Sequence, residues 1–374
     1  MRKIIVLVAI VQFQLGCTSS KYSVEVDADE KMHQPLSIIL MIGDGMGLPQ
    51  ISTAFYFGSE NSNFERFKNI GFHKSSSTSH WITDSAAGAT AFSIGEKTYK
   101  RAIGVSKDTL AKETILQRLQ KKGYQTGLVS LTSITHATPA SFYAHVKDRD
   151  MHEDIAEQLV SSNIDFLAGG GKKYFNKRSD GLDLFEELKD KAYHLDTLSL
   201  STTQRSKKNA FIISDDGLPS KIEGRGDFLK EATEKALSYF DSSDKPFFMM
   251  IEGSYIDWGG HDENAEMVIT EVQDFDLTLG TVLDYVEKHP NTLVIVTADH
   301  ETGGVSIGKF YDTDEVTGKK KEVPQRVGVY FNTDQHSGEL IPVFAKGKGA
   351  ENFQGIYENS MIYHHIFRAI DEGN

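Results

Sequence analysis

Several features that are common in other classes of protein are scarce or absent in this sequence. Its 374 residues include a single cysteine, so no disulfide within the chain can contribute to stability. The apolar run near the start, residues 4–11, is shorter than the roughly 20 residues that a membrane-spanning helix needs. The formal net charge is −13, and no block of Lys and Arg stands out against it. These absences argue against a disulfide-stabilised fold and against a nucleic-acid partner.

The first 35 residues divide into a leader and a polar segment. Two basic residues precede the apolar run, and Leu15-Gly16-Cys17 follows it, in the order typical of a bacterial lipoprotein signal whose cysteine becomes lipidated. Gln14 departs from the apolar residue usual at that place, so secretion without lipidation is the alternative. Residues 18–35 predict a solvated tether. We therefore expect an exported protein, periplasmic or lipid-anchored through Cys17 at the cell envelope.

From residue 36 to the C-terminus, strand-like and helix-like segments alternate. Continuous apolar runs, typical of strands buried on both faces, are separated by amphipathic helical patterns. We therefore expect one domain over residues 36–374, an α/β fold with a doubly wound, largely parallel sheet and helices on both faces. Residues 305–335 predict a small charged surface insertion. The apolar runs begin at Leu36, Gln125, Phe247, Asn291 and Leu340, and the helical patterns end at Gly123, Phe240 and His289.

Polar side chains follow most of these apolar runs. In open α/β sheets, ligands bind beyond the carboxyl ends of the strands. Carboxylates and imidazoles are ordinary ligands of Zn²⁺, and carboxylates with hydroxyls suit Mg²⁺. Each residue alone is better explained by a turn or a helix cap, but together they predict a metal site at one sheet edge. They are Asp44 in GDGMG, His136 and Thr138 in THATPASFYAHVKDR, Glu252, Asp257 and His261 in EGSYIDWGGH, Asp299 and His300 in TADHETGG, and His336 in QHSGEL.

Ser85, in the stretch TDSAAGAT, is the candidate nucleophile. It stands at the start of an expected helix, where free N–H groups and the helix dipole favour an anion. The small residues after it, Ala86 to Gly88, also fit a simpler interpretation, a helix packed close to the sheet. The sequence has no GxSxG elbow and no evident Ser-His-Asp partners. A serine needs a base or a metal to become an effective nucleophile, and this sequence offers metals.

In this order, the six motifs resemble those of the alkaline phosphatases, and IDFLAGGGKKYF near residue 164 is similar too. The resemblance runs from about Pro35 to the C-terminus. It implies that residues 36–374 are a catalytic domain that hydrolyses small phosphate monoesters through a phosphoserine, with two zinc ions and one magnesium ion. It also implies a homodimer. The short interval before His336 implies a small crown insertion, as in compact bacterial members.

The matching motifs also imply a role for each site residue. Ser85 would carry the phosphate, and Arg149 would grip two phosphate oxygens while Asp84 orients it. His136 and Trp258 stand where members of the family vary, near the magnesium and near the phosphate. The implied metal ligands form three sets: Asp257, His261 and His336 for one zinc, Asp44, Asp299 and His300 for the zinc that also coordinates Ser85, and Asp44, Thr138 and Glu252 for magnesium.

Two other functions stay open from the sequence. One is a phosphodiesterase or sulfatase of the same superfamily, although the sulfatase Cys/Ser-x-Pro-x-Arg pattern is absent after Ser85 and Arg149 favours monoesters. The other is a non-catalytic surface lipoprotein that stores zinc or captures phosphate. Zinc storage needs neither Ser85 nor Arg149, so the presence of both favours the enzyme.

Overall fold

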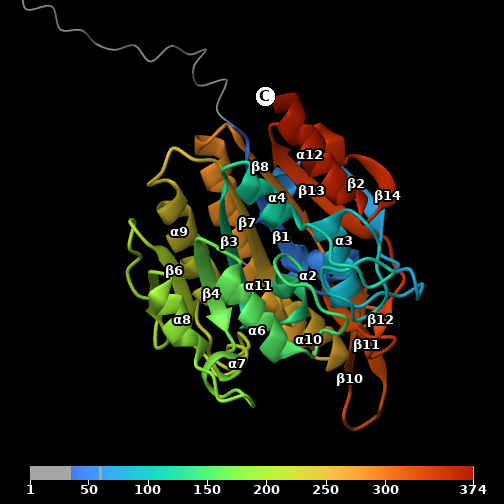
Figure 1. Ribbon diagram of the computed structural model, residues 1–374. Coiled ribbons are helices and arrows are strands. Elements are labelled where there is room, and N and C mark those ends of the chain that lie inside the picture. Colours follow the sequence, from blue (N-terminus) through green and yellow to red (C-terminus); the bar gives the residue numbers. More distant parts are fainter. Residues whose placement is uncertain (1–34, 59–60, 374) are drawn as a thin grey trace, which may run out of the picture. The chain divides into compact units, whose positions relative to one another are not determined.

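Ten strands of the described residues form one mixed sheet, in the order β14-β2-β13-β8-β1-β7-β3-β4-β6-β5. The structure is a computed structural model that describes residues 35–58 and 61–373 (Figure 1). The leader with Cys17 and the tether up to residue 34 lie outside the described residues, so the predictions for them stay predictions. Within the described part, no helix combines the length and the apolar character needed to cross a membrane.

Four parallel strands predicted from apolar runs form the centre of the sheet. β1 (Ser37–Gly43) lies between β7 (Phe247–Gly253) and β8 (Thr292–Thr297), and β3 (Gln125–Ser133) pairs with the other side of β7. All residues of β1, β7 and β8 are buried, which is why their sequences are mostly apolar rather than alternating. The parallel pairing brings the carboxyl ends of these strands to one edge.

The fifth predicted strand, β13 (Ile341–Gly347), runs antiparallel to both of its neighbours, β8 and β2 (Asn69–Lys74). A continuous apolar run indicates burial on two faces but carries no information on strand direction. The sheet is still largely parallel, as predicted. Five of its strands were not marked by apolar runs; they are β2, β4 (Phe166–Gly170), β5 (Tyr193–Asp196), β6 (Lys208–Ile212) and β14 (Gly355–Glu358).

Helices cover both faces of the sheet (Figure 1). Alternate residues of β1 enter two separate cores: Ile39 packs with α2 (Leu48–Phe57), α9 (Phe228–Phe240) and α11 (Ala265–Lys288). Its neighbour Leu40 packs with the helices of the opposite face. Those helices are α3 (Ser85–Ile94), α4 (Ile115–Lys121), α6 (His152–Ser161), α8 (Leu184–Asp190) and α12 (Met361–Gly373).

The helical pattern that ends at Gly123 starts later in the structure than in the sequence. Thr114 caps α4: its Oγ1 accepts the Gln117 N–H at 3.2 Å, and the Gln117 side chain accepts the Thr114 N–H at 3.0 Å. The helix ends at Lys121, and Gly123 follows with a φ of 87°, a left-handed conformation that glycine adopts without a Cβ clash.

The predicted surface insertion is largely an antiparallel hairpin of β10 (Ser306–Thr313) and β11 (Lys320–Tyr330), which extends away from the sheet (Figure 1). Most of its residues are exposed, as its charged sequence requires. The remaining short elements are η1 (Asn63–Arg66), α5 (Ala137–Ala140), α7 (Lys173–Asn176), α10 (Tyr255–His261), β9 (Glu301–Thr302), β12 (His336–Ser337) and η2 (Ala350–Phe353).

Candidate active site

Three buried carboxylates meet at the carboxyl ends of β8, β1 and β7. Asp44 follows β1, Asp299 follows β8, and Glu252 lies near the end of β7. Each is at most 1% exposed. The strand register sets the relative positions of these carboxylates, because Ile42 pairs with Glu252 on one side and with Thr297 on the other. The structure thus brings together residues that are up to 255 positions apart in the sequence.

Burial and mutual repulsion raise the pKa of these carboxyl groups. Desolvation is the largest cause for each. The pKa of Asp44 lies well above its ordinary value, with repulsion from Asp299 and Asp257 adding to the effect of burial. The pKa of Asp299 rises to about 8, and that of Glu252 is also raised. Buried negative charge of this density is costly unless a cation compensates it.

Several buried polar atoms at this edge have no hydrogen-bond partner among the described residues. They include Glu252 Oε1, Asp299 Oδ2 and His136 Nδ1. The other Glu252 oxygen accepts a 2.5 Å hydrogen bond from Ser130 Oγ, so the two oxygens of one carboxylate differ in their surroundings. Since buried polar atoms are normally paired, these atoms fit the ligand set of a cation.

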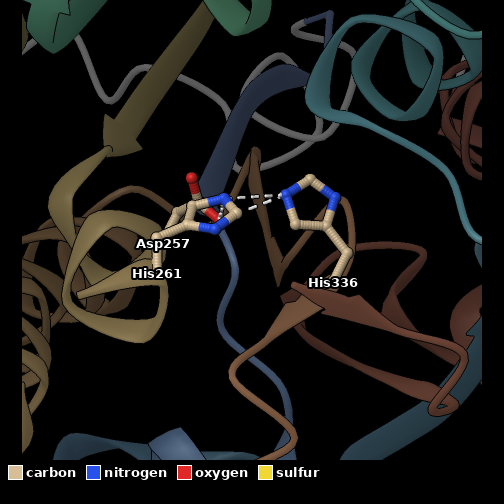
Figure 2. A group of neighbouring side chains, drawn as sticks. All are labelled: Asp257, His261 and His336. Atoms are coloured by element: carbon tan, nitrogen blue, oxygen red, sulfur yellow. Dashed lines mark hydrogen bonds and ion pairs between the residues drawn. The ribbon is translucent and has the colours of Figure 1, made fainter. Parts of the chain in front are cut away.

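Asp257, His261 and His336 form the first of three groups that could hold a metal ion (Figure 2). His261 Nδ1 lies 2.6 Å from the carbonyl oxygen of Asp334, and His336 Nδ1 lies 2.9 Å from that of Thr83. A carbonyl only accepts, so each Nδ1 carries the proton and each Nε2 of a neutral ring has a free lone pair.

The atoms left free in this group point at one another. The two Nε2 atoms lie 3.1 Å apart, and they lie 3.5 Å (His261) and 3.6 Å (His336) from Asp257 Oδ1 (Figure 2). Burial lowers the pKa of His336, which keeps its ring neutral. With both rings in the neutral form, three electron-rich atoms converge with no proton between them, and a divalent cation satisfies such an arrangement.

Asp44, Asp299 and His300 form the second group, and Ser85 lies against it. His300 Nε2 is 3.3 Å from Asp299 Oδ2 and 3.5 Å from Asp44 Oδ1. The Ser85 hydroxyl oxygen is 3.2 Å from the same nitrogen and 3.5 Å from Asp44 Oδ1. Burial lowers the pKa of His300 well below its ordinary value, so the imidazole is neutral and available as a ligand.

Asp44 also belongs to the third group, with His136 and Glu252, whose ligand atoms lie within 4.8 Å of one another. Thr138 Oγ1 donates to Asp44 Oδ2 at 3.5 Å, which places this hydroxyl beside the group. Burial, with the nearby Arg149 charge, lowers the pKa of His136 well below its ordinary value. The structure therefore gathers the residues of the predicted magnesium set and adds His136 to them.

Ser85 is the first residue of α3 and is 2% exposed. Asp84 caps this helix, since its Oδ1 accepts the Ala87 N–H at 3.2 Å. A Cβ on Gly88 would lie 2.9 Å from Cβ of Asp299, so glycine is needed for the helix to approach the sheet edge this closely. The small residues of TDSAAGAT therefore permit close packing against the sheet, and this packing places Ser85 among the buried carboxylates, while its role as the nucleophile stays a prediction.

Arg149 reaches the same place from the segment after α5. Its Nη1 donates to Asp84 Oδ2 at 3.2 Å, and its Nη2 lies 3.2 Å from His136 Nε2. Asp84 in turn accepts the backbone N–H of Arg101, at 3.1 and 3.2 Å to its two oxygens. Sequence reasoning missed Arg101, because a contact made through the backbone leaves no signal in the residue type.

Two hydroxyl residues of the site were also missed. Thr302 Oγ1 donates to Asp257 Oδ1, and Ser130 donates to Glu252. Thr302 lies within the TADHETGG motif, two residues after His300, and its place there was a usable signal. Ser130 lies inside an apolar strand and offers none.

A cavity of about 570 Å³ leads to the site, and its lining includes Asp84, Arg149, His261 and His336. Trp258, predicted near the phosphate, does not line this cavity. It is 41% exposed on α10, and its ring meets that of Tyr255 edge to face with a centroid distance of 4.6 Å.

The known proteins described next, which are similar in sequence or structure, are alkaline phosphatases. The family model described as alkaline phosphatase matches residues 36–334, which ends just before His336. Alkaline phosphatase 3 of Bacillus subtilis (strain 168) is 31% identical, over 89% of this chain and 88% of that protein. The alkaline phosphatase structure from the Antarctic bacterium TAB5 is 44% identical with a TM-score of 0.86, over 91% of this chain and 98% of that one. A variant of the TAB5 enzyme with a histidine replaced by aspartate, solved with Mg bound in its M3 site, is 45% identical with a TM-score of 0.87, over 91% of this chain and 99% of that one.

Proposed function

The chain belongs to the alkaline phosphatase family and is a phosphomonoesterase, and we propose that it works through a phosphoserine on Ser85, with two zinc ions and one magnesium ion. One observation carries the proposal. The Ser85 hydroxyl lies at a helix N-terminus, against His300 and Asp44, and the adjacent residue Asp84 lines the same cavity as Arg149. A store for metal or phosphate needs no hydroxyl at that point.

Ser85 and Arg149 have different roles toward the substrate: Arg149 binds the phosphate and Ser85 attacks it. The guanidinium of Arg149 offers a planar fork suited to two phosphate oxygens, and Asp84 holds that fork in place through Nη1. Ser85 then attacks the phosphorus in line, its O–P bond forms while the bond to the alcohol oxygen breaks, and the alcohol leaves. Water breaks the new O–P bond in a second displacement and frees inorganic phosphate.

The three groups of side chains would hold the cations. When bound, the zinc ions act as Lewis acids that lower the pKa of the Ser85 hydroxyl and neutralise charge on the departing oxygen. Glu252 Oε1 and Asp299 Oδ2, which have no hydrogen-bond partner among the described residues, fit this use. We assign Asp257, His261 and His336 to one zinc, Asp44, Asp299 and His300 to the other, and Asp44, Thr138 and Glu252 to magnesium, with His136 beside them.

The charge balance of the site also supports cations. Three divalent ions and the Arg149 guanidinium would outweigh the negative charge of the surrounding carboxylates and attract a phosphate dianion. Without cations, the acidic groups at this edge outnumber the Arg149 guanidinium, so the edge would bind that substrate poorly. The carboxylates concerned are Asp44, Asp84, Glu252, Asp257 and Asp299.

An assay with matched substrates tests the proposal. Purified protein should hydrolyse p-nitrophenyl phosphate much faster than bis(p-nitrophenyl) phosphate, lose activity with a chelator, and regain it with zinc and magnesium. Acid quenching after addition of labelled phosphate should place the label on Ser85. A preference for the diester, full activity with manganese alone, or a label elsewhere would each contradict a part of the proposal.

We also propose that the protein is exported and anchored through Cys17, on the order of charge, apolar run and cysteine at the start of the sequence. Cys17→Ser should move the protein from the membrane fraction to the soluble fraction without changing its specific activity. Mass spectrometry of an unmodified Cys17, or of a chain that begins elsewhere, would reduce the proposal to simple export.

A homodimer is proposed on the family resemblance. Light scattering of the purified protein should give twice the mass of the mature chain, and a monomer mass at micromolar concentration would contradict it.

A further inference from the structure

The cavity lined by Asp84 and Arg149 also has Trp81 in its lining, an aromatic side chain that the proposed reaction does not use. Besides Arg149, the lining includes Trp81, Ile82 and Lys100. Trp81 is 90% exposed and Ile82 is 40% exposed. A tryptophan in a folded protein ordinarily buries about 150–250 Å² of surface, so nearly all of this capacity is unused within the chain.

The loop that presents Trp81 is held in place. The N–H of Thr78 donates to the carbonyl oxygen of Thr98 at 2.8 Å, and the N–H of Lys100 donates to Ser79 Oγ at 3.0 Å. These bonds tie the loop to the segment that follows α3. Because the backbone is already ordered, a ligand that contacts Trp81 does not have to order the loop first.

The same loop continues directly into the catalytic residues. Two positions after Trp81, the carbonyl oxygen of Thr83 faces His336 Nδ1 at 2.9 Å, and Ser85 follows two positions later. The position of the indole relative to the attacking hydroxyl is therefore set by a short, tethered stretch of backbone. A group joined to the phosphorus of a bound monoester would extend from the phosphate site into this cavity.

We propose that Trp81 forms a subsite for the leaving alcohol, and that the enzyme favours monoesters whose alcohol carries a planar aromatic ring, as in aryl phosphates and nucleotides. The inference rests on the proposed reaction at Ser85. Every nucleobase and aryl ring has a π face, so stacking on an exposed indole recognises the class and tolerates variation within it. Ile82 adds apolar surface beside the ring.

Competing substrates of the same charge test this subsite. We would measure kcat/KM for AMP, phenyl phosphate and glycerol 2-phosphate in the wild type, Trp81→Ala and Trp81→Phe. The ratios of AMP and of phenyl phosphate to glycerol 2-phosphate should fall about fivefold or more in Trp81→Ala, the effect expected when one stacking contact is lost, and mainly through KM. Trp81→Phe should keep most of each ratio, and a fall for one substrate alone identifies which aromatic source the subsite serves.

Leu110→Ala is the matched control, because Leu110 is also exposed, at 64%, but does not line this cavity. It should leave both ratios as in the wild type. Ratios that stay unchanged in Trp81→Ala would overturn the inference. An equal loss on all three substrates with a smaller mass by light scattering would also overturn it, since Trp81 would then contact a second copy of the chain.

Fluorescence gives a readout that does not depend on turnover. The chain has two tryptophans, so Ser85→Ala with Trp258→Phe leaves Trp81 as the single fluorophore. AMP should quench this emission and inorganic phosphate should not, whereas equal responses would overturn the inference. If the wild type hydrolyses none of the three substrates, the proposed reaction is wrong, and the titration still decides whether an aromatic ring binds at Trp81.

Discussion

Two clusters of buried carboxylates in this protein have opposite surroundings. In the first, Glu271 and Asp274 on α11 face Arg225, whose Nη2 lies 2.6 Å from Glu271 Oε2 and 2.9 Å from Asp274 Oδ2. Lys221 Nζ adds a 2.6 Å contact to Asp274. In the second, at the sheet edge, buried carboxylates face one another, and some of their oxygens have no hydrogen-bond partner among the described residues.

The difference shows that burial alone does not mark a functional carboxylate. The side chains of Glu271, Asp274 and Arg225 are at most 2% exposed, as deeply buried as Asp44 and Asp299. The charges of the first cluster are compensated within the chain, so it connects α11 to the loop before α9. The second cluster is compensated only when something else binds, and this need identifies it as the site.

The largest expected effect is on catalytic turnover and leaves the stability of the fold unchanged. Ser85→Ala should lower kcat by roughly a thousandfold or more, since the covalent step is lost. Metal content and melting temperature should not change. Ser93→Ala is the matched control, because Ser93 lies buried in the same helix with a hydroxyl that has no partner among the described residues. A Ser85→Ala variant within tenfold of wild-type turnover would contradict the mechanism.

The next effect concerns the paired cluster. Glu271→Ala should cost about 3 kcal/mol of unfolding free energy, because it leaves part of the Arg225 charge buried without its partner. The folded variant should keep its metal content and kcat. In chelated protein at pH 9, where Asp299 is largely ionised, Asp299→Ala should cost much less than Glu271→Ala, since it removes a repelling charge. Urea unfolding of both chelated variants measures this contrast, and equal costs would remove the distinction between the two clusters.

A smaller effect follows from the pKa of Asp299. Because that pKa is raised to about 8, the folded state holds this proton more tightly than the unfolded chain does. The stability that this proton contributes is complete below the unfolded pKa, about 4, and is lost as the pH rises through 8. Buried histidines with a lowered pKa change the stability mainly below about pH 6.5, the ordinary pKa of the unfolded chain. Above pH 7 they are largely neutral in both states.

Chelated protein should therefore lose roughly 1 kcal/mol between pH 7 and pH 9. Asp299→Asn should flatten this dependence, and saturating zinc should abolish it, because bound cations keep the carboxylates ionised. Urea unfolding at three pH values is the measurement. Chelated wild type that gains stability over this range would show that the sheet edge is compensated within the chain after all.

The smallest predicted effect concerns His136. Magnesium prefers oxygen ligands and zinc accepts imidazole, so the third group should bind magnesium weakly and admit excess zinc, which would inhibit. His136→Asp should tighten magnesium by less than about tenfold and weaken that inhibition. Unchanged magnesium affinity in His136→Asp would place His136 outside the metal site.

The sequence predicted the parts of the fold and site that depend on local patterns. β1 and β7 were recognisable because burial on both faces leaves an unbroken apolar run, and Ser85 and Arg149 because they stand in distinctive motifs. The direction of β13 was not predictable, since the same run suits either orientation.

Other features depend on tertiary contacts that residue types do not reveal. Glu271 and Asp274 resemble the solvated face of an amphipathic helix, and their partner Arg225 lies 46 positions away in the sequence from Glu271. Trp81 follows a serine-rich stretch, and only the folded chain shows that it faces the cavity rather than a core.

The position of β1 between β7 and β8 has a consequence for how the site can evolve. Neighbouring strands lie about 4.8 Å apart because backbone hydrogen bonds fix that distance. The sheet therefore sets the spacing of Asp44, Glu252 and Asp299, whether or not an ion is bound. Exchange of one metal for another changes the fit within each site but not the interval between sites. Side chains that do not adjoin these three strands, such as His136, can then change the metal preference while this spacing stays constant.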